Sequence, residues 1–332
     1  KQATIVFSSV GYKPLEIVVG NQTQLIVVMV QEITQLDQIV VVGYGTQRKK
    51  DLTGSIAIVS TKDMKSLAVP SISDALQGRA AGVQVISSGA PGSDATFRIR
   101  GAGTINNNDP LLVIDGVSVS SGLNTLNMND VESMQVLKDA SATAIYGSRG
   151  ANGVVIITTK RGKGEKSHLD FNYFFGMQKA TNVVQMLNAS EFASLHNDIM
   201  ANAGLAQNPA YSDPASLGTG TDWLGELFNP APMQNFSLSY SGGSEKTNVY
   251  VSANYLTQKG IVMNTGFNKL SLQFNSDTNV FNNLKLGNSL TLNHDIKTSG
   301  NYSIRNTMLA LPTQPILQEN GNYSGPIQQP VW

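Results

Sequence analysis

Apolar and polar residues alternate along five segments in the part of the chain that follows Ser167. The segments are Leu169–Met177, Phe236–Ser241, Val249–Tyr255, Leu270–Asn275 and Leu284–Asn293. Successive side chains of a β-strand point to opposite faces, so a period of two predicts strands with one apolar and one polar face. We therefore expect five antiparallel strands, each about ten residues long.

The connections between these predicted strands alternate in length. A very long connection runs from Gln178 to Pro232, and a mid-length loop runs from Thr257 to Gly266. Tight turns are predicted at Gly242–Glu245 and Asn279–Asn283. Short turns at one end and long loops at the other are typical of a transmembrane β-barrel.

A soluble antiparallel sheet would show the same alternation. Two features favour the barrel. The polar face carries almost only uncharged Ser, Thr, Asn and Gln side chains, which suits a hydrated lumen. Aromatic residues lie near strand ends, at Tyr240, Tyr255 and Phe267, where an interfacial girdle would place them.

The preceding region, residues 52–164, predicts a compact α+β unit. A helix is expected over Ser71–Gly78, with Ser73 as its cap, and a second over Ala140–Tyr146, ended by Gly147. The expected strands are Val83–Ile86, Thr96–Arg100, Leu111–Ile114, Val131–Leu137 and Gly153–Thr159.

The first residues predict three short strands separated by turn signals. These are Thr4–Val10, Leu15–Val19 and Gln24–Val30, and they resemble the tail end of a small β-sandwich. Residues 36–51 follow as an extended, β-branched stretch, with two glycines and a charged end. On their own, residues 36–51 predict one more strand and a linker.

Composition narrows the function classes. The chain of 332 residues has 23 basic and 23 acidic residues, so its net charge is zero and it lacks the global field that attracts nucleic acid. Charged residues make up 14%, against about 25% in ordinary soluble domains. Without cysteine it has no disulfide framework, and no apolar run approaches the length of a transmembrane helix.

The chain begins at Lys1 and ends at Trp332, which suggests a processed or fragmentary sequence. Five membrane strands cannot close a barrel, because the smallest known barrels have about 8. We therefore expect that these residues alone do not form a working channel.

A long run of residues makes the region recognisable. Residues 110–164 read PLLVIDGVSVSSGLNTLNMNDVESMQVLKDASATAIYGSRGANGVVIITTKRGKG. This string resembles the plug domain of the SusC/RagA-type TonB-dependent outer-membrane transporters of Bacteroidetes. Further strings resemble the same family: FSSVGYKPLEIVVG, VVVGYGTQRKKDLTGSI, DALQGRAAGVQV, FRIRGAGTINNNDPLLVIDG, and NPAPMQNFSLSYSGGSEKTNVYVSANYLTQKGIVMNTGFNKLSLQFN.

The resemblance implies an architecture. Residues 1–35 would end a carboxypeptidase-regulatory-like β-sandwich, and residues 36–51 would form a TonB-box linker. Residues 52–164 would form the α+β plug domain, and residues 165–332 the first antiparallel strands and outer loops of a barrel with about 22 strands.

The resemblance also implies a function. Such transporters import oligosaccharides, or other bulky nutrients such as peptides, across the outer membrane of Gram-negative bacteria. The periplasmic protein TonB pulls on the plug, a SusD-like surface lipoprotein acts as a lid, and neither cofactor nor covalent catalysis is involved.

The TonB box is expected at Ile39, Val40, Val41, Val42, Gly43 and Tyr44. An apolar β-branched segment can be captured as an added strand, in which main-chain hydrogen bonds supply the affinity. The alternative is the plain strand and linker that composition predicts.

Charged side chains of the plug are candidates for a latch to the barrel wall. They are Arg98, Arg100, Glu132 and Arg149. Arg98 and Arg100 alternate along one predicted strand and would point the same way, toward wall carboxylates. Alternatively, these groups pair inside the plug or face water. Gln135 stands where an acidic residue is common in the wider receptor family, which weakens an inherited ion pair there.

An outward plug loop offers candidate cargo contacts at Asn106, Asn107, Asn108 and Asp109. Such side chains could contact sugar hydroxyls or a hard cation, and the alternative is an Asx-rich turn before Pro110. The glycines of residues 147–153 follow a helix, so they do not form a phosphate loop at a helix N-terminus.

The sequence offers little support for an enzyme. The histidines at 168, 196 and 294 lack metal-ligand spacing. Carboxylates are sparse after residue 165, which disfavours a glycan hydrolase. A soluble β-rich glycan-binding or adhesion protein is the competing hypothesis, and it requires an exposed face unlike one that contacts lipid.

Overall fold

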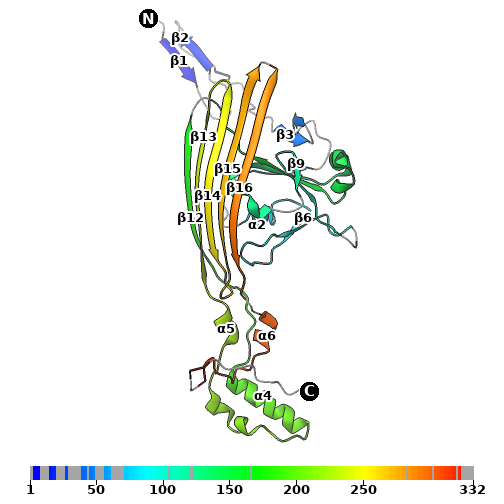
Figure 1. Cartoon of the computed structure of the whole chain (residues 1–332), viewed down its shortest axis with the longest axis vertical. Coiled ribbons are helices and arrows are strands. Elements are labelled where there is room, and N and C mark those ends of the chain that lie inside the picture. Colours follow the sequence, from blue (N-terminus) through cyan, green and yellow to red (C-terminus); the bar gives the residue numbers. More distant parts are fainter. Residues whose placement is uncertain are drawn as a thin grey trace.

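The computed structural model describes residues 3–7, 15–19, 27–28, 39–42, 45–48, 56–60, 71–103, 105, 107–119, 123–162, 164, 167–281, 283–300, 303–318 and 321–322. A long five-stranded sheet forms one part of the molecule, and a smaller α+β unit, which we call the plug, lies against one of its faces (Figure 1). Connections with helices, which we call the outer loops after their expected position, extend from one end of the sheet, whereas the hairpin of β1 (Ala3–Phe7) and β2 (Leu15–Val19) lies at the other end (Figure 1).

The plug is built on a five-stranded sheet with the order β5-β10-β11-β8-β9. Its strands are β5 (Ile56–Ser60), β8 (Leu111–Ile114), β9 (Val117–Val119), β10 (Val131–Leu137) and β11 (Val154–Thr159). Strand β11 pairs parallel with β8, and the other pairs are antiparallel. A separate hairpin joins β6 (Val83–Ile86) to β7 (Thr96–Ile99).

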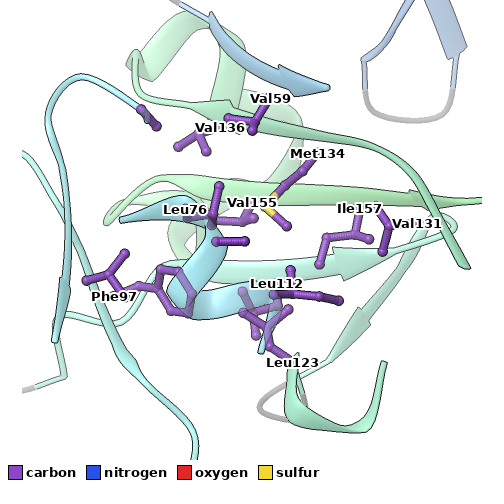
Figure 2. Close-up of a cluster of buried hydrophobic side chains, with 14 of the residues drawn as sticks. Val59, Leu76, Phe97, Leu112, Leu123, Val131, Met134, Val136, Val155 and Ile157 are labelled. Atoms are coloured by element: carbon purple, nitrogen blue, oxygen red, sulfur yellow. The ribbon is translucent and has the colours of Figure 1, made fainter. Parts of the chain in front are cut away.

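The plug core lies on both faces of its sheet, as the strands β11 and β8 show. In β11, Val155 and Ile157 join the larger cluster with Met134 and Leu76, which Figure 2 shows beside Phe97 and Leu123. Val154 and Ile156 point to the other face and pack on Leu111 and Val113. Burial on both faces explains why these strands are runs of apolar residues without alternation.

Short helices close the plug. They are α2 (Ile72–Leu76), α3 (Ala140–Thr143) and the 3-10 helices η2 (Leu123–Thr125), η3 (Met128–Asp130) and η4 (Ala144–Gly150). Helix α2 is capped by Ser71, whose Oγ accepts a hydrogen bond from the Asp74 amide at 3.1 Å. The predicted cap, Ser73, is instead buried inside the helix.

The long sheet contains β12 (His168–Gln178), β13 (Ala231–Gly243), β14 (Thr247–Lys259), β15 (Gly266–Phe281) and β16 (Leu284–Thr298) in sequential antiparallel order. The five predicted strands are therefore confirmed, with lengths of 11, 13, 13, 16 and 15 residues. They exceed the expected length because backbone pairing continues past the last alternating apolar residue.

The register of β15 corrects one expectation. Tyr240 and Tyr255 lie on the exposed face, as expected, at 42% and 44% exposure. Phe267 is only 5% exposed and lies on the opposite face of the sheet from Phe274. The two phenylalanines are seven residues apart, and an odd separation along a strand reverses the face.

The outer loops contain α4 (Ala189–Asn202), η5 (Pro209–Tyr211), η6 (Pro214–Leu217), α5 (Trp223–Leu227) and α6 (Ile304–Met308). Asn188 and Glu191 form a capping box that starts α4 within the long connection, where no helix was predicted. Among the described residues, no helix is both long and apolar enough to cross a membrane.

The N-terminal residues form two hairpins. Strand β1 (Ala3–Phe7) pairs with β2 (Leu15–Val19), and β3 (Ile39–Val42) pairs with β4 (Gly45–Arg48). Of the third strand predicted at Gln24–Val30, residues 27 and 28 lie in no strand and the others fall outside the described residues. The β-sandwich therefore stays a prediction.

Candidate gate between the plug and the sheet

The face of the long sheet that meets the plug is polar and buried. We call this part of β13, β14 and β15 the wall, and its contact with the plug the seam. Its buried polar side chains and its one tyrosine are Ser237, Ser239, Tyr250, Ser252, Asn254, Gln258, Lys269, Ser271, Gln273 and Asn275. The intervening residues on the opposite face, such as Leu238, Val251 and Leu272, are apolar and exposed.

Lys269 is the charged member of this buried wall set. Its side chain is 5% exposed, and its ammonium donates to two plug carbonyls. The Nζ atom lies 2.6 Å from the oxygen of Asn124 and 3.1 Å from that of Leu126. Charged donors form the stronger class of hydrogen bond, particularly away from water.

A carboxylate of the plug faces the wall nearby. Asp130 ends η3, and its Oδ1 accepts a hydrogen bond from the Tyr250 hydroxyl at 2.8 Å. Burial raises the pKa of Asp130 above its ordinary value of 3.8, while hydrogen bonds and the charge of Lys160 oppose that shift. Loss of hydration disfavours the charged form of a carboxyl group, and at Asp130 this effect exceeds that of its partners.

Neutral hydrogen bonds attach the end of β11 to the wall. Asn275, which is fully buried, donates through Nδ2 to the Thr159 hydroxyl at 2.9 Å and to the Lys160 carbonyl at 2.7 Å. Asp115 holds Thr159 in place by accepting its amide at 2.8 Å. The side-chain amide of Asn275 therefore bonds to the end of β11, which Asp115 already holds in place within the plug.

The junction between the plug and the sheet is tightly packed. Arg161 and Asp277 form a salt bridge with Nη1 and Oδ1 2.9 Å apart. At the next position, a Cβ on Gly162 would lie 2.3 Å from the backbone nitrogen of Val249 and 2.8 Å from the oxygen of Gly242. Only glycine allows the chain to pass this close to the backbones of β13 and β14.

An apolar contact and a small cavity lie farther along the seam. Phe267 packs with Met233 and Leu256, and its ring approaches Gly92 so closely that a Cβ there would lie 2.2 Å from Cδ2. A cavity of about 310 Å³ opens beside it, between the plug and the sheet, with Gln178 and Gln258 in its lining.

The predicted latch residues have partners inside the plug. Arg98 pairs with Asp109, Arg100 pairs with Asp139, and the Arg149 guanidinium donates to the Ser118 hydroxyl. Glu132 lies half-buried in β10. For the three arginines, the alternative of pairing within the plug therefore describes the contacts observed.

Arg100 shows where the sequence argument failed. Strand β7 ends at Ile99, and Arg100 has a positive φ of 59°, so it lies beyond the strand. The alternation that would have aligned Arg100 with Arg98 stops before it. Pairing within the plug gives each of the two side chains a carboxylate partner.

The asparagine-rich loop forms an Asx turn. Asn107 Oδ1 accepts the amide of Asp109, and Asn108 Oδ1 accepts the amide of Gly103, both at 2.8 Å. Asn106 lies outside the described residues. The turn interpretation accounts for these contacts, and a role in cargo binding stays a prediction.

The expected TonB box is described in part. Ile39–Val42 form β3, which pairs antiparallel with Gly45–Arg48. Ile39 lies opposite Arg48, and Val42 lies opposite Gly45. Gly43 and Tyr44 lie outside the described residues. The extended conformation expected of Ile39, Val40, Val41 and Val42 is present.

A larger cavity of about 1230 Å³ lies among the outer loops. Its lining includes Phe192, His196, Tyr211 and Trp223. The rings of His196 and Tyr211 meet edge to face with centroids 5.1 Å apart, and the indole of Trp223 donates to the Leu311 carbonyl at 2.9 Å. This cavity lies in the long connection and the segment after β16, where the sequence predicted only loops.

The seam residues were missed from sequence, although one signal was present. Lys269 has the same parity as Ser271 and Gln273, so the alternation placed a cation among mostly uncharged polar side chains of this strand. Asp130, Tyr250 and Asn275 gave no such signal, because their partners are more than a hundred residues away in sequence.

Comparison with known proteins agrees with this arrangement. The profile of the TonB-dependent Receptor Plug Domain family matches residues 48–154. A TonB-dependent receptor of Formosa agariphila is 43% identical over 97% of this chain and 33% of its own length. The TonB-dependent receptor SusC of Bacteroides thetaiotaomicron is 35% identical over 96% of this chain and 32% of its own.

Solved structures of the same family have a similar fold. The RagAB peptide importer in its open-open state matches with a TM-score of 0.73 and 32% identity, over 86% of this chain and 36% of that one. The chain thus spans about a third of the length of the relatives that it matches. The matched plug, the antiparallel sheet and these relatives show that the chain belongs to the SusC/RagA-type TonB-dependent receptors.

Proposed function

We propose that the chain is part of an outer-membrane importer in which the plug is a movable closure of the passage. The observation that carries this proposal is the chemistry of the seam. The wall beneath the plug presents hydroxyl and amide groups, so its hydrogen bonds to the plug can be exchanged for hydrogen bonds to water or cargo. A permanently packed core would instead bury apolar side chains.

The outward face of the sheet supports a place in the membrane. Leu238, Val251, Phe274 and their neighbours expose apolar side chains in continuous rows, and the rings of Tyr173 and Phe236 pack together at 4.7 Å. Soluble proteins rarely expose an apolar surface of this extent. This face argues against a soluble glycan-binding or adhesion protein and favours the outer membrane of a Gram-negative bacterium.

We propose TonB as the partner that supplies energy, through Ile39–Tyr44. Strand β3 has one edge paired with β4, so strand addition by TonB would use its other edge or replace β4. A SusD-like surface lipoprotein is the second proposed partner. The proposed division is a sandwich remnant at 1–35, a TonB-box linker at 36–51, a plug at 52–164 and barrel strands from 165.

The cargo is proposed to be an oligosaccharide or a peptide. SusC and the RagAB peptide importer are the relatives that suggest these two classes. No covalent step and no cofactor enter the proposal, since displacement of the plug needs only the making and breaking of hydrogen bonds.

Uptake in cells that produce the full-length receptor tests the coupling. Labelled maltooligosaccharides and labelled peptide mixtures serve as the two cargo probes. Val41→Pro removes a main-chain N–H from β3 and should abolish uptake, whereas Val41→Ile keeps the β-branched side chain and should leave it intact. Equal uptake by both variants would refute TonB coupling through this segment.

A reversible cross-link tests plug movement. Asn127 of the plug and Ser237 of the wall lie with Nδ2 and Oγ 3.4 Å apart, and the chain contains no native cysteine. With cysteine at both positions, a short reducible thiol cross-linker should stop uptake, and reduction should restore it. Each single cysteine is the matched control, and continued uptake by the cross-linked receptor would contradict the proposal.

A further inference from the structure

The buried charge of the seam is concentrated at one place. Within the part of the chain that the structure describes, Asp130 and Lys269 are the charged members of the buried polar set, and the others are Ser, Thr, Asn and Gln. Asp130 belongs to the plug and Lys269 to the wall, and the carboxylates of Asp130, Asp295 and Asp94 all attract the ammonium of Lys269. Each also bonds to a neutral group on the other side.

The plug segment that Lys269 contacts is held from two sides. Leu123 and Leu126 bury their side chains in the plug core. The carbonyls of Asn124 and Leu126 accept from Lys269 on the wall side. Residues 123–130 run directly into β10, a central strand of the plug sheet, so a shift at this contact is carried to the core of the plug.

We propose that Lys269 is a positioning residue of the seam. Its ammonium holds residues 123–130 of the plug against the wall while the plug closes the passage. This inference rests on the proposed function, in which the plug moves for cargo to pass. Tyr250 has a supporting role, since its hydroxyl holds Asp130 at the end of the same segment.

The burial of Lys269 explains why this contact is both strong and reversible. In the dry seam, its ammonium has the two carbonyls as partners, and water does not compete with them. When the segment lifts, water hydrates the ammonium and both carbonyls, so no unpaired buried charge is left. The Arg161–Asp277 pair is partly exposed and already screened, and it therefore holds the plug less strongly.

Hydrogen exchange of the full-length receptor in lipid nanodiscs tests the proposal. Lys269→Met keeps the length of the side chain but removes the cation. It should speed amide exchange in residues 123–130 by about 10- to 100-fold, which is the effect expected from loss of a hydrogen bond to a charged group. Exchange in β11 should not change. Lys297→Met is the matched control, because Lys297 lies on the neighbouring strand and is exposed.

A conservative replacement and a second variant make the test decisive. Lys269→Arg should restore slow exchange, at least in part, because it keeps the cation. Tyr250→Phe should speed exchange near residue 130 even if Lys269→Met does not fold. Exchange in residues 123–130 of folded Lys269→Met that matches the Lys297→Met control would overturn the proposal. If Lys269→Met does not fold, unchanged exchange in Tyr250→Phe would overturn it.

Uptake by the same variants separates the two proposals. Faster exchange together with altered uptake supports release of the Lys269 contact as a step of import. If residues 123–130 respond as expected but the wild-type receptor takes up neither cargo probe, the contact is established while the proposed function fails.

Discussion

Replacing Gly162 by alanine should force the plug away from the wall at their junction. A Cβ there would lie 2.3 Å from the nitrogen and 2.6 Å from the oxygen of Val249, where ordinary contacts begin at 3.4 Å. These are backbone atoms of a paired strand, so the strand cannot rotate aside and the junction has to move by about 1 Å.

The cost can be worked out from the neighbouring contacts. Overpacking of this kind costs about 1–3 kcal/mol. The same movement would break the 2.7 Å hydrogen bond from Asn275 to the Lys160 carbonyl, which adds about 1 kcal/mol. A total of about 2–4 kcal/mol corresponds to roughly 30- to 700-fold faster local opening.

Amide exchange of residues 154–162 in the full-length receptor measures this effect. Gly103→Ala is the matched control, because a Cβ on Gly103 meets no atom within 4 Å and its φ is not in the positive range. If Gly162→Ala exchanges at the rate of the Gly103→Ala control, the close approach of the two backbones is not what positions the plug.

Three further predictions concern the plug and its charges. Met134→Ala, at a fully buried position, should destabilise the plug by about 2–5 kcal/mol in denaturant unfolding, because it leaves a cavity in the core. Arg161→Gln should cost at most about 1 kcal/mol, since its pair with Asp277 is partly exposed, and a double-mutant cycle should show the coupling shrinking with added salt. Because burial raises the pKa of Asp130, the folded plug keeps a proton that the unfolded chain releases. Plug stability should therefore fall as pH rises through the interval above 3.8, and Asp130→Asn should lack that part of the slope in unfolding measured across this pH range.

The strands and their faces could largely be predicted from the sequence. Period-two alternation reveals a strand when only one of its faces is buried. Strands β13, β14 and β15 are buried on one face in this way. Strands β6, β8 and β10 were also predicted with the bounds that the structure shows. Composition and turn signals suffice there because each strand is short and flanked by glycine or polar residues.

The helices and caps were harder to predict. Ser71 and Ser73 are both suitable cap residues, and only the backbone shows that Ser71 is extended while Ser73 is already helical. The helix predicted at Ala140–Tyr146 continues as a 3-10 helix across a kink at Gly147, whose φ is 59°. Local sequence does not fix such endings, since packing on the sheet decides them.

The candidate site could not be assembled from sequence, because its contacts join distant segments. Asp130 and Tyr250 are 120 residues apart, and Lys269 lies 143 residues from Leu126. Charge alone predicted arginine latches to the wall, whereas Arg98 and Arg100 pair with carboxylates within the plug. Charge identifies residues that need a partner, whereas topology decides which partner they find.

The low charge of the chain follows from the two faces of the wall. In the proposed outer-membrane importer its outward face contacts lipid, in which an exposed charge is costly. Its inward face is covered by the plug, so each charge there would lose hydration on closing and regain it on opening. Hydroxyl and amide groups carry a smaller desolvation cost, which makes a seam built from them easy to open. One buried cation, Lys269, adds charge-assisted hydrogen bonds to the carbonyls of Asn124 and Leu126, which are stronger than those of the uncharged groups around it.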